Sequence, residues 1–200
     1  MWTMIIGAPG TSKHKIAELL TKDGYEYQKW IVDVKGDDNL FMREATYFTQ
    51  RLKKQLEIER VRRETDIVTV RGAWDSIEVF GSVLAKRGEI DSVQFDALRF
   101  IYEGLLETMP PPDVVVHLKV GEKMASYNRM ALKDERISED YFSQLVDAYD
   151  HYVSLLAIPV IDVDHGHVLD KVWDQVEFGI QSIKTSGLSG DTIWKRGMFK

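Results

Sequence analysis

Apolar positions follow two different periods along this chain, and the two periods alternate. Short runs of apolar and β-branched residues are typical of buried strands, while apolar residues three or four positions apart are typical of amphipathic helices. The short runs predict strands at residues 2–7, 25–34, 66–70, 113–120 and 158–163. The longer segments predict helices at residues 13–22, 39–63, 74–86, 92–109, 122–132, 138–156 and 169–183. This alternation indicates an α/β fold, a three-layer α/β/α arrangement in which helices flank a five-stranded parallel sheet.

Three of the helical segments show one clear apolar face that we expect to pack inward. Pro110 to Pro112 end the second of these segments, and Ser138 is the expected N-cap of the third. The predicted inward positions are Phe41, Ala45, Phe48, Leu52 and Leu56, then Phe95, Leu98, Ile101, Leu105 and Met109, and finally Phe142, Leu145, Tyr149, Tyr152 and Leu156.

Between the first strand and the first helix, the chain turns through glycines and a proline and reaches a lysine. Backbone N–H groups and the positive end of a helix dipole bind anions at such a turn, and the lysine adds a charge. The phosphate-loop pattern is G-x-x-x-x-G-K-[ST]. Here a serine replaces the second glycine and a histidine replaces the metal-binding hydroxyl, so the match is good for phosphate and poor for metal. The predicted loop is Gly7, Ala8, Pro9, Gly10, Thr11, Ser12, Lys13 and His14.

The carboxyl ends of parallel strands form the edge where α/β proteins bind ligands. That rule places four segments along one edge of the sheet. They are the loop 7–13, the pair Arg71-Gly72, the turn 120–121 and the loop 162–167.

Composition and charge exclude several classes of protein. The net charge of −6 and the pI near 5.4 disfavour a protein that lives on duplex nucleic acid, although a local basic groove is allowed. The basic run at 51–63 is interleaved with Glu57 and Glu59, which favours a solvated helix face over such a groove. There is no cysteine, and hence no disulfide or thiolate chemistry. No apolar run reaches membrane-spanning length and no leader pattern is seen, so a cytoplasmic protein is the simplest interpretation.

Several segments, in order and over most of the chain, resemble the deoxynucleoside kinase family of P-loop kinases. Residues 66–80 resemble that family's strand ending in Glu-Arg-Ser and the helix after it, and residues 112–120 resemble its fourth strand. Residues 128–136 fall where the family has an arginine-bearing lid, and residues 137–149 resemble the helix after the lid. Residues 25–30 resemble the second-strand signature E-P-x-x-K-W, one residue short and without the proline.

The resemblance implies transfer of the γ-phosphoryl group of ATP to the 5′-hydroxyl of a deoxynucleoside, with Mg²⁺. It implies that Lys13 and the loop amides hold the β- and γ-phosphates and that Arg71 stabilises charge near the acceptor. Glu26 is the best match for the carboxylate that takes the hydroxyl proton. The other implied contacts are Trp30 and Gln50 at the base, and Arg129, Lys133 and Arg136 in a lid at about 129–137.

Three departures from the family pattern concern the metal. Val70 replaces the glutamate before the arginine, Gly72 replaces the serine after it, and His14 replaces the loop hydroxyl. Asp75, one helical turn beyond Arg71, is the candidate metal ligand and could instead read a base edge. Three explanations stay open: the metal is held by ATP and water, the acceptor is a nucleoside monophosphate or a modified base in DNA, or the protein binds nucleotide with decayed activity.

These observations predict one kinase-like domain at residues 1–184 and a C-terminal tail at residues 185–200. The expected partner is a small nucleoside or nucleotide, and nothing in the chain suggests a membrane. The helices at 40–61 and 74–109 are long enough to pair with a second copy, and the family resemblance implies a homodimer.

Overall fold

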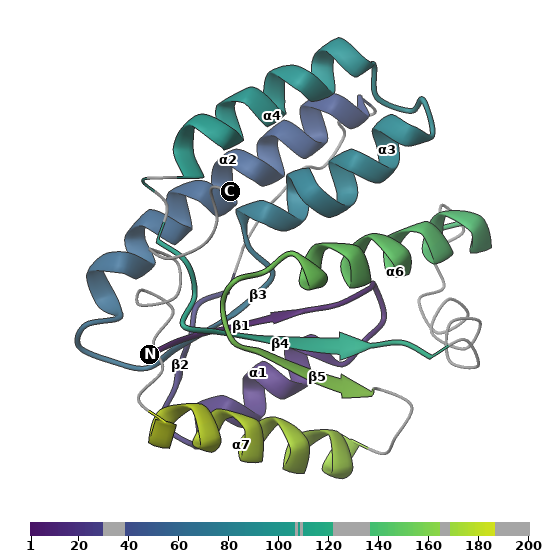
Figure 1. Ribbon diagram of the computed structural model, residues 1–200. Coiled ribbons are helices and arrows are strands. Elements are labelled where there is room, and N and C mark those ends of the chain that lie inside the picture. Colours follow the sequence, from purple (N-terminus) through teal and green to yellow (C-terminus); the bar gives the residue numbers. More distant parts are fainter. Residues whose placement is uncertain (30–38, 107, 109, 122–136, 165–168, 187–200) are drawn as a thin grey trace.

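The computed structural model describes residues 1–29, 39–106, 108, 110–121, 137–164 and 169–186. Its strands form one parallel sheet of five strands in the order β2-β3-β1-β4-β5 (Figure 1). The strands are β1 (Trp2–Ile6), β2 (Glu26–Tyr27), β3 (Ile67–Val70), β4 (Val114–Lys119) and β5 (Val160–Asp164). The predicted α/β fold is confirmed. Strand β2 has only two residues, and the second half of the segment predicted for it, residues 30–34, lies outside the described part.

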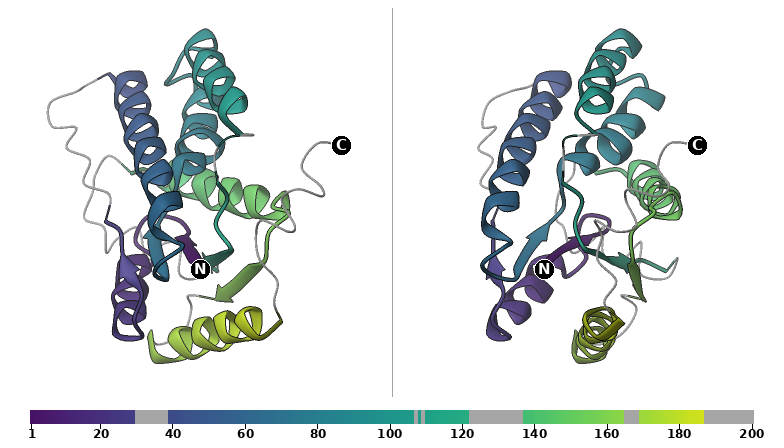
Figure 2. Two further views of the ribbon diagram at one scale, coloured as in Figure 1. Left: turned by 90° about the vertical axis from the view of Figure 1, so that its left-hand side faces the viewer. Right: turned by 60° about the vertical axis from the view of Figure 1, so that its left-hand side comes forward.

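Helices cover both faces of the sheet (Figures 1 and 2). Helices α1 (Lys13–Lys22) and α7 (Leu169–Ser186) lie on one face, where they enclose an apolar core with β-strand residues such as Ile5 and Val116. The other face carries α2 (Leu40–Val61), the π-helix η1 (Asp75–Gly81), α3 (Ser82–Lys86), α4 (Ser92–Leu106) and α6 (Glu139–Ser154). The second core lies there and includes Trp2, Trp74 and Phe142.

The starts of α2 and α6 follow from capping residues. Asn39 Oδ1 accepts a hydrogen bond from Met42 N at 3.1 Å, and Ser138 Oγ accepts one from Tyr141 N at 3.1 Å. Each bond satisfies a backbone donor that the first helical turn leaves without an intrahelical partner. The predicted cap at Ser138 is confirmed.

The buried face of α2 is rotated from the predicted one. Leu56 was predicted to face inward but is 45% exposed, and the buried positions are Glu44, Phe48, Arg51, Gln55 and Ile58. The polar members are buried because they find partners: Gln55 Nε2 donates to Pro110 O at 2.9 Å, and Arg51 Nη1 donates to Ser76 Oγ at 2.7 Å. In α4, Ile101 is likewise 50% exposed, whereas Leu98 is buried as predicted and Tyr102 is buried as well. The prediction for Leu56 was wrong because apolar spacing does not show that Arg51 and Gln55 are buried with polar partners. The prediction for Ile101 was also wrong.

The segment predicted as one regular helix, 74–86, contains a π-helical stretch at Asp75–Gly81 before α3 begins. A β-carbon at Gly81 would lie 2.8 Å from Ser76 O and 3.0 Å from a Phe95 ring carbon. The wide turn therefore packs closely against α4, and π-helical turns of this kind are often found at functional sites.

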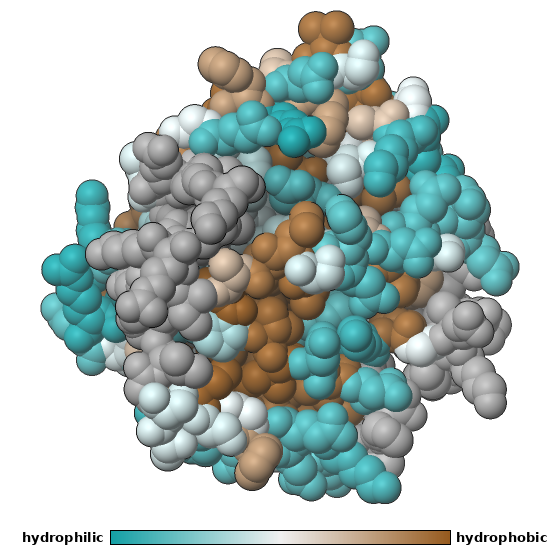
Figure 3. All heavy atoms as spheres, in the orientation of Figure 1, coloured by the Kyte–Doolittle hydropathy of each residue, from teal (hydrophilic) through white to brown (hydrophobic). Residues whose placement is uncertain are grey.

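The surface in the orientation of Figure 1 has an apolar area in its middle, surrounded by polar atoms (Figure 3). Within the described ranges, no helix is both long enough and apolar enough to cross a membrane.

Candidate active site

The loop between β1 and α1 has the backbone of a tight anion-binding turn. Gly7 and Gly10 have φ angles of 142° and 82°, a region that side chains rarely adopt. A β-carbon on Gly7 would lie 2.7 Å from Leu118 O of the neighbouring strand β4. Glycine is therefore required at position 7 on both counts, and the loop emerges at the carboxyl end of the central strand.

Lys13 is the charged group of this loop, and it is only 3% exposed. Its Nζ donates to Ala8 O at 2.6 Å and to Thr11 Oγ1 at 2.8 Å. Burial lowers the pKa of Lys13 well below its usual value, the charge of Arg71 lowers it further, and Asp75 opposes both. Because Lys13 bonds to no carboxylate in the described part of the chain, a bound phosphate would supply the counter-charge that this ammonium lacks.

His14 points away from the loop. Its Nδ1 lies 2.5 Å from the hydroxyl of Tyr27 in β2. Burial lowers the pKa of His14, and the charges of Lys13 and Arg71 lower it further, so the neutral imidazole is favoured. Among the described residues, no group of three His, Cys, Asp or Glu could hold a metal ion.

Arg71 lies beside the loop because β3 is the neighbour of β1. Its backbone N donates to Ile5 O at 2.8 Å. Its φ is 68°, a left-handed conformation that costs a non-glycine residue about 1–3 kcal/mol and is common at functional sites. The guanidinium lies 4.7 Å from the centre of the Phe80 ring, and its Nε has no hydrogen-bond partner among the described residues. Burial opposes the charge of Arg71, but Tyr149 and Asp75 outweigh it, so the pKa of Arg71 is raised.

Asp75 holds this turn from within the π-helix, and it is fully buried. Its Oδ2 accepts from Gly72 N at 2.7 Å, and its Oδ1 accepts from the Tyr149 hydroxyl at 2.8 Å. Tyr149 was predicted as core only, yet it links α6 to this site. Both oxygens of Asp75 are engaged in positioning, which fits a metal ligand poorly.

Two buried charges of α2 were missed as site residues. Arg51, which the sequence placed on a solvated face, is 6% exposed, and its side chain lies over the Tyr47 ring at 5.2 Å. Glu44 is 4% exposed, and Arg43 Nε lies 3.7 Å from its Oε1. Burial raises the pKa of Glu44, while Arg51, Arg43 and Arg71 act in the opposite direction. The signal in the sequence was the seven-residue spacing of Glu44 and Arg51 around Phe48, which puts all three on one helix face.

Other predicted residues do not join this group. Glu26 is exposed, accepts a hydrogen bond from the Gln28 amide, and pairs with Ile67 at the start of β3. That register puts it four residues before Arg71, about 13 Å toward the amino end of the sheet. Gln50 is exposed on the outer side of α2. Trp30, Arg129, Lys133 and Arg136 lie outside the described residues.

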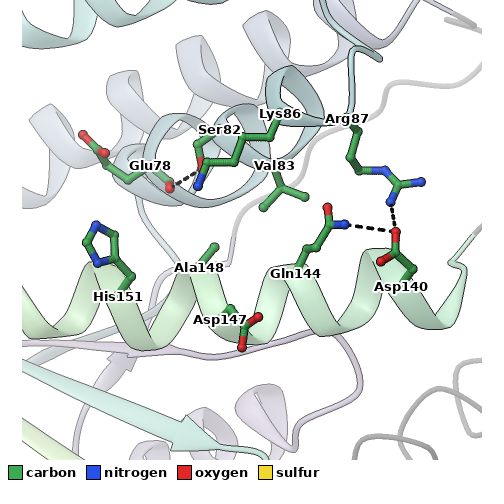
Figure 4. A pocket seen from close by; sticks show the side chains of 10 residues that line it. All are labelled: Glu78, Ser82, Val83, Lys86, Arg87, Asp140, Gln144, Asp147, Ala148 and His151. Carbon is green, nitrogen blue, oxygen red and sulfur yellow. Dashed lines mark hydrogen bonds and ion pairs between the residues drawn. The ribbon is translucent and has the colours of Figure 1, made fainter.

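A cavity of about 660 Å³ lies elsewhere, between η1 and α3 on one side and α6 on the other. Figure 4 shows Glu78, Lys86 and Asp147 at this cavity, with Arg87 paired to Asp140 at one end. None of the phosphate-loop residues lines it. We identify the candidate active site from its chemistry, the desolvated cations at the loop, and not from this cavity.

Comparison with known proteins gives a family and a fold. The family model described as deoxynucleoside kinase matches residues 41–184, more than half of the chain, though not the phosphate loop. The structure of deoxyadenosine kinase from M. mycoides with bound dATP is similar, with a TM-score of 0.71, 18% identity, and coverage of 90% of this chain and 100% of that one. The structure of that enzyme with bound dCTP gives a TM-score of 0.69, 19% identity, and coverage of 91% and 100%. The comparison with curated proteins gave no match.

Proposed function

Since the chain belongs to the deoxynucleoside kinase family, we propose that it transfers the γ-phosphoryl group of ATP to the 5′-hydroxyl of a deoxynucleoside. The observation that carries this proposal is a pair of desolvated cations, the buried Lys13 and the partly buried Arg71, which follow the adjacent strands β1 and β3 at the carboxyl edge of the sheet. Phosphoryl transfer requires cations aimed at the transferring oxygens in a site that excludes water.

In this reaction the acceptor oxygen bonds to the γ-phosphorus, the bond from that phosphorus to the β-phosphate oxygen breaks, and ADP leaves. Lys13 and the amides of loop 7–13 hold the phosphates of ATP. Arg71 stabilises the charge on the transferring group, and Asp75 fixes the turn that aims it. Because the transition state is loose, positioning and charge stabilisation provide most of the rate.

The acceptor would lie against the inner face of α2, where Glu44 and Arg51 are buried. Glu44 interacts through its charge with both Arg51 and Arg71, so it is better placed than Glu26 to accept a proton or a hydrogen bond from the acceptor. The lid residues Arg129, Lys133 and Arg136, with Trp30, stay predictions from the family resemblance.

A metal ion held by this chain does not fit the described residues. His14 faces Tyr27, a buried valine stands at position 70, and both oxygens of Asp75 accept hydrogen bonds. The family uses ATP with a divalent ion, and we propose that Mg²⁺ enters bound to ATP, with water as its remaining ligand. We therefore assign Asp75 a positioning role.

A nucleoside monophosphate is the second candidate acceptor. The specific observation is that Nε of Arg51 and Nε of Arg71 are both buried and both lack a partner among the described residues. Two guanidiniums with unused donors suit an anionic acceptor, because each offers a directed N–H bond to a phosphate oxygen.

Two further proposals concern the assembly and the location of the protein. Val93 and Phe100 are 74% and 79% exposed on α4, next to the half-exposed Ile101, and this apolar surface supports a homodimer through α4. A cytoplasmic location agrees with use of ATP and small nucleosides.

The test is transfer from γ-labelled ATP with Mg²⁺ to a panel of deoxynucleosides, their monophosphates and DNA. Transfer to deoxynucleosides that is lost in Lys13→Ala and Arg71→Ala, but retained in the remote control Lys184→Ala, supports the proposal. Preference for monophosphates selects the second candidate. ATP binding without transfer to any acceptor contradicts both, and indicates decayed activity.

A further inference from the structure

His117 is a buried polar side chain close to the phosphate loop. It lies in β4 and pairs with Ile6 of β1, the residue directly before Gly7 of the loop. It is 2% exposed, whereas the other two histidines in the described part of the chain, His14 and His151, are exposed. A polar group buried to this extent has partners in most proteins, and those partners indicate its role.

A carboxylate of the neighbouring strand fixes the protons of this ring. His117 and Asp162 stand opposite each other in the register of β4 and β5, and His117 Nδ1 lies 2.9 Å from Asp162 Oδ1. An ionised carboxylate can only accept a hydrogen bond, so Nδ1 carries the proton and Nε2 is the position for a second one. Nε2 faces Asp150 Oδ1 of α6 at 3.9 Å, which is too far for a hydrogen bond.

The imidazole also supports a tyrosine of the helix above it. Helix α6 lies next to β4 (Figure 1), and the Tyr149 ring is stacked on the His117 ring with centroids 6.3 Å apart and planes 28° apart. The Phe80 ring of η1 meets the Tyr149 ring at 88°, also with centroids 6.3 Å apart. Both distances are typical of favourable aromatic pairs. Ring contacts with two elements, β4 and η1, therefore fix where the Tyr149 hydroxyl points.

The contacts of Tyr149 lead to Arg71. The Tyr149 hydroxyl donates to Asp75 Oδ1 at 2.8 Å, and Asp75 Oδ2 accepts from the backbone N of Gly72, the residue after Arg71. The Phe80 ring, which Tyr149 contacts, lies 4.7 Å from the Arg71 guanidinium. A shift of Tyr149 would therefore move both the turn and the ring that aim this guanidinium. One continuous line of contacts runs from the half-exposed carboxylate of β5 to Arg71.

We propose that His117, with a proton on Nδ1 alone, is a positioning residue for the phosphoryl-transfer site. The bond to Asp162 fixes the imidazole, the imidazole fixes the Tyr149 ring, and Tyr149 fixes the turn that aims Arg71. His117 acts through Tyr149 and not on the substrate. This inference rests on the proposed function, because that function gives Arg71 its role in transfer.

A second proton on Nε2 should disturb this arrangement. The imidazolium would present a new donor to Asp150, which draws the ring away from the stacked tyrosine. Burial opposes this charge most strongly, while Asp162 and Asp150 favour it and Lys119 opposes it, and the pKa of His117 is lowered overall. The neighbour on β1, Ile6, carries no charge. The neutral ring therefore prevails at neutral pH, and transfer should slow as the pH falls through the lowered pKa.

The pH profile of the single-turnover rate separates positioning from packing alone. In the parent chain, the rate should fall on the acid side with a midpoint equal to the pKa of His117 measured by NMR. Asp162→Asn keeps an acceptor oxygen but removes a charge that favours the imidazolium, so the midpoint should move to lower pH. Lys119→Met removes the opposing cation and should move it to higher pH. The matched control is His151→Gln, an exposed histidine of α6, which should leave the profile unchanged.

Replacing the ring itself gives the size of the effect. His117→Phe keeps an aromatic ring beside Tyr149 but cannot take a proton, so the acid limb of the profile should disappear. His117→Ala removes the ring, and the single-turnover rate at saturating ATP should fall at least ~10-fold, because a small displacement of a positioned group slows transfer strongly. Binding of ATP should change little, since Lys13 and the loop amides are untouched.

An NMR titration tests the same contacts without a reaction. In the parent chain, the Gly72 amide signal should follow the titration of His117. In Tyr149→Phe, which lacks the hydroxyl that joins the two regions, it should no longer do so. The Gly24 amide, after the far end of α1, is the control signal and should not follow His117 in either protein.

The outcomes separate this inference from the proposed function. A parent chain that transfers no phosphoryl group contradicts the proposed function, and the NMR titration then decides whether His117 positions the turn. The inference is overturned if the Gly72 amide does not follow His117. It is also overturned if an active enzyme keeps the same acid midpoint in both Asp162→Asn and Lys119→Met.

Discussion

The two ends of the β-sheet treat charged side chains in opposite ways. At the amino end, Asp66 accepts a hydrogen bond from Lys184, and Asp113 accepts one from Trp2 N at 2.6 Å. Burial opposes the charge of Asp66, but its bonds outweigh that effect and the pKa of Asp66 is lowered. At the carboxyl end, Lys13, Glu44 and Arg51 all have pKa values shifted by burial toward the neutral form.

The difference shows where stability and where function reside. Charges at the amino end are paired in the protein and therefore stabilise the fold. Charges at the carboxyl end are desolvated and incompletely paired, and Arg71 adds a left-handed backbone. Such a group of charges costs stability without ligand and gains it on binding an anion. Substitutions of the incompletely paired charges at the carboxyl end should therefore affect activity and stability in the opposite way to substitutions at the amino end, whereas Asp75, whose two oxygens are both hydrogen-bonded, should contribute to both properties.

The largest effect is expected at Lys13. Lys13→Met keeps the length of the side chain but removes the buried charge, so transfer should fall by about 10²-fold or more. The free energy of unfolding without ligand should stay the same or rise, because a desolvated ammonium is lost. Steady-state kinetics and urea unfolding measure the two. Lys184→Met is the control, with full activity and a slightly lower stability. Loss of both activity and stability in Lys13→Met would break the comparison.

Asp75 should come next, because its two oxygens join Gly72 and Tyr149. Asp75→Asn keeps the shape of the side chain but replaces one acceptor by a donor, so we expect a loss of about 1–3 kcal/mol of stability and a lower kcat. The Mg²⁺ concentration for half-maximal rate should not change. Tyr149→Phe, which removes the same hydrogen bond from the other side, should reproduce part of the loss. A large rise in the Mg²⁺ requirement of Asp75→Asn alone would restore Asp75 as a metal ligand.

Glu44 should show a pH-dependent effect of intermediate size. Its raised pKa means that the folded state favours the protonated carboxyl, so its penalty is absent below the ordinary pKa of glutamate and grows as the pH rises through the raised value. Glu44→Gln should therefore be more stable than the parent at pH 7, by about 1 kcal/mol, or about 2–4 °C in Tm.

The advantage of Glu44→Gln should vanish near pH 4, which urea unfolding at several pH values would show. Activity should fall at every pH, because the substitution removes an acceptor at the proposed acceptor site. Glu57→Gln, on the outer side of the same helix, is the control with no change in either property.

The smallest effect is expected at the amino end. Asp66 has a lowered pKa, so its contribution is present above the ordinary pKa of aspartate and is lost as the pH falls through the lowered value. Asp66→Asn should lower the stability by less than about 1 kcal/mol at pH 7, because the pair is about one-third exposed. The difference from the parent should shrink as the pH falls through the lowered pKa of Asp66 and vanish below it, with activity unchanged throughout.

The fold was predictable because strands buried on both faces leave continuous apolar runs, and β4 is the clearest case. The predicted strands also predicted the positions of the phosphate loop and of Arg71, because each follows directly after the end of a strand. Asp75 was singled out because it lies one helical turn beyond Arg71, but its role depends on the hydroxyl of Tyr149, 74 residues away in α6. No local pattern encodes that partnership.

Two assignments made from the sequence meet the same limit. Glu26 was chosen from a signature in the sequence, whereas its place is set by its pairing with Ile67, which only the assembled sheet defines. Arg51 was assigned to a solvated face because its neighbours are charged, yet its own helix position points to Ser76. Chain order predicts elements, and the register between elements decides which side chains meet.

The π-helix makes the length of the chain at residues 75–81 as important as its sequence. In a helix of this kind, residues five positions apart stack on one side, which lets both Asp75 and Phe80 face Arg71. Deleting one residue between them would restore an ordinary α-helix and turn the residues after it by about 100°. Such a deletion would leave a well-formed helix but would turn either Asp75 or Phe80 away from Arg71. We therefore expect this segment to tolerate substitutions far more readily than insertions or deletions.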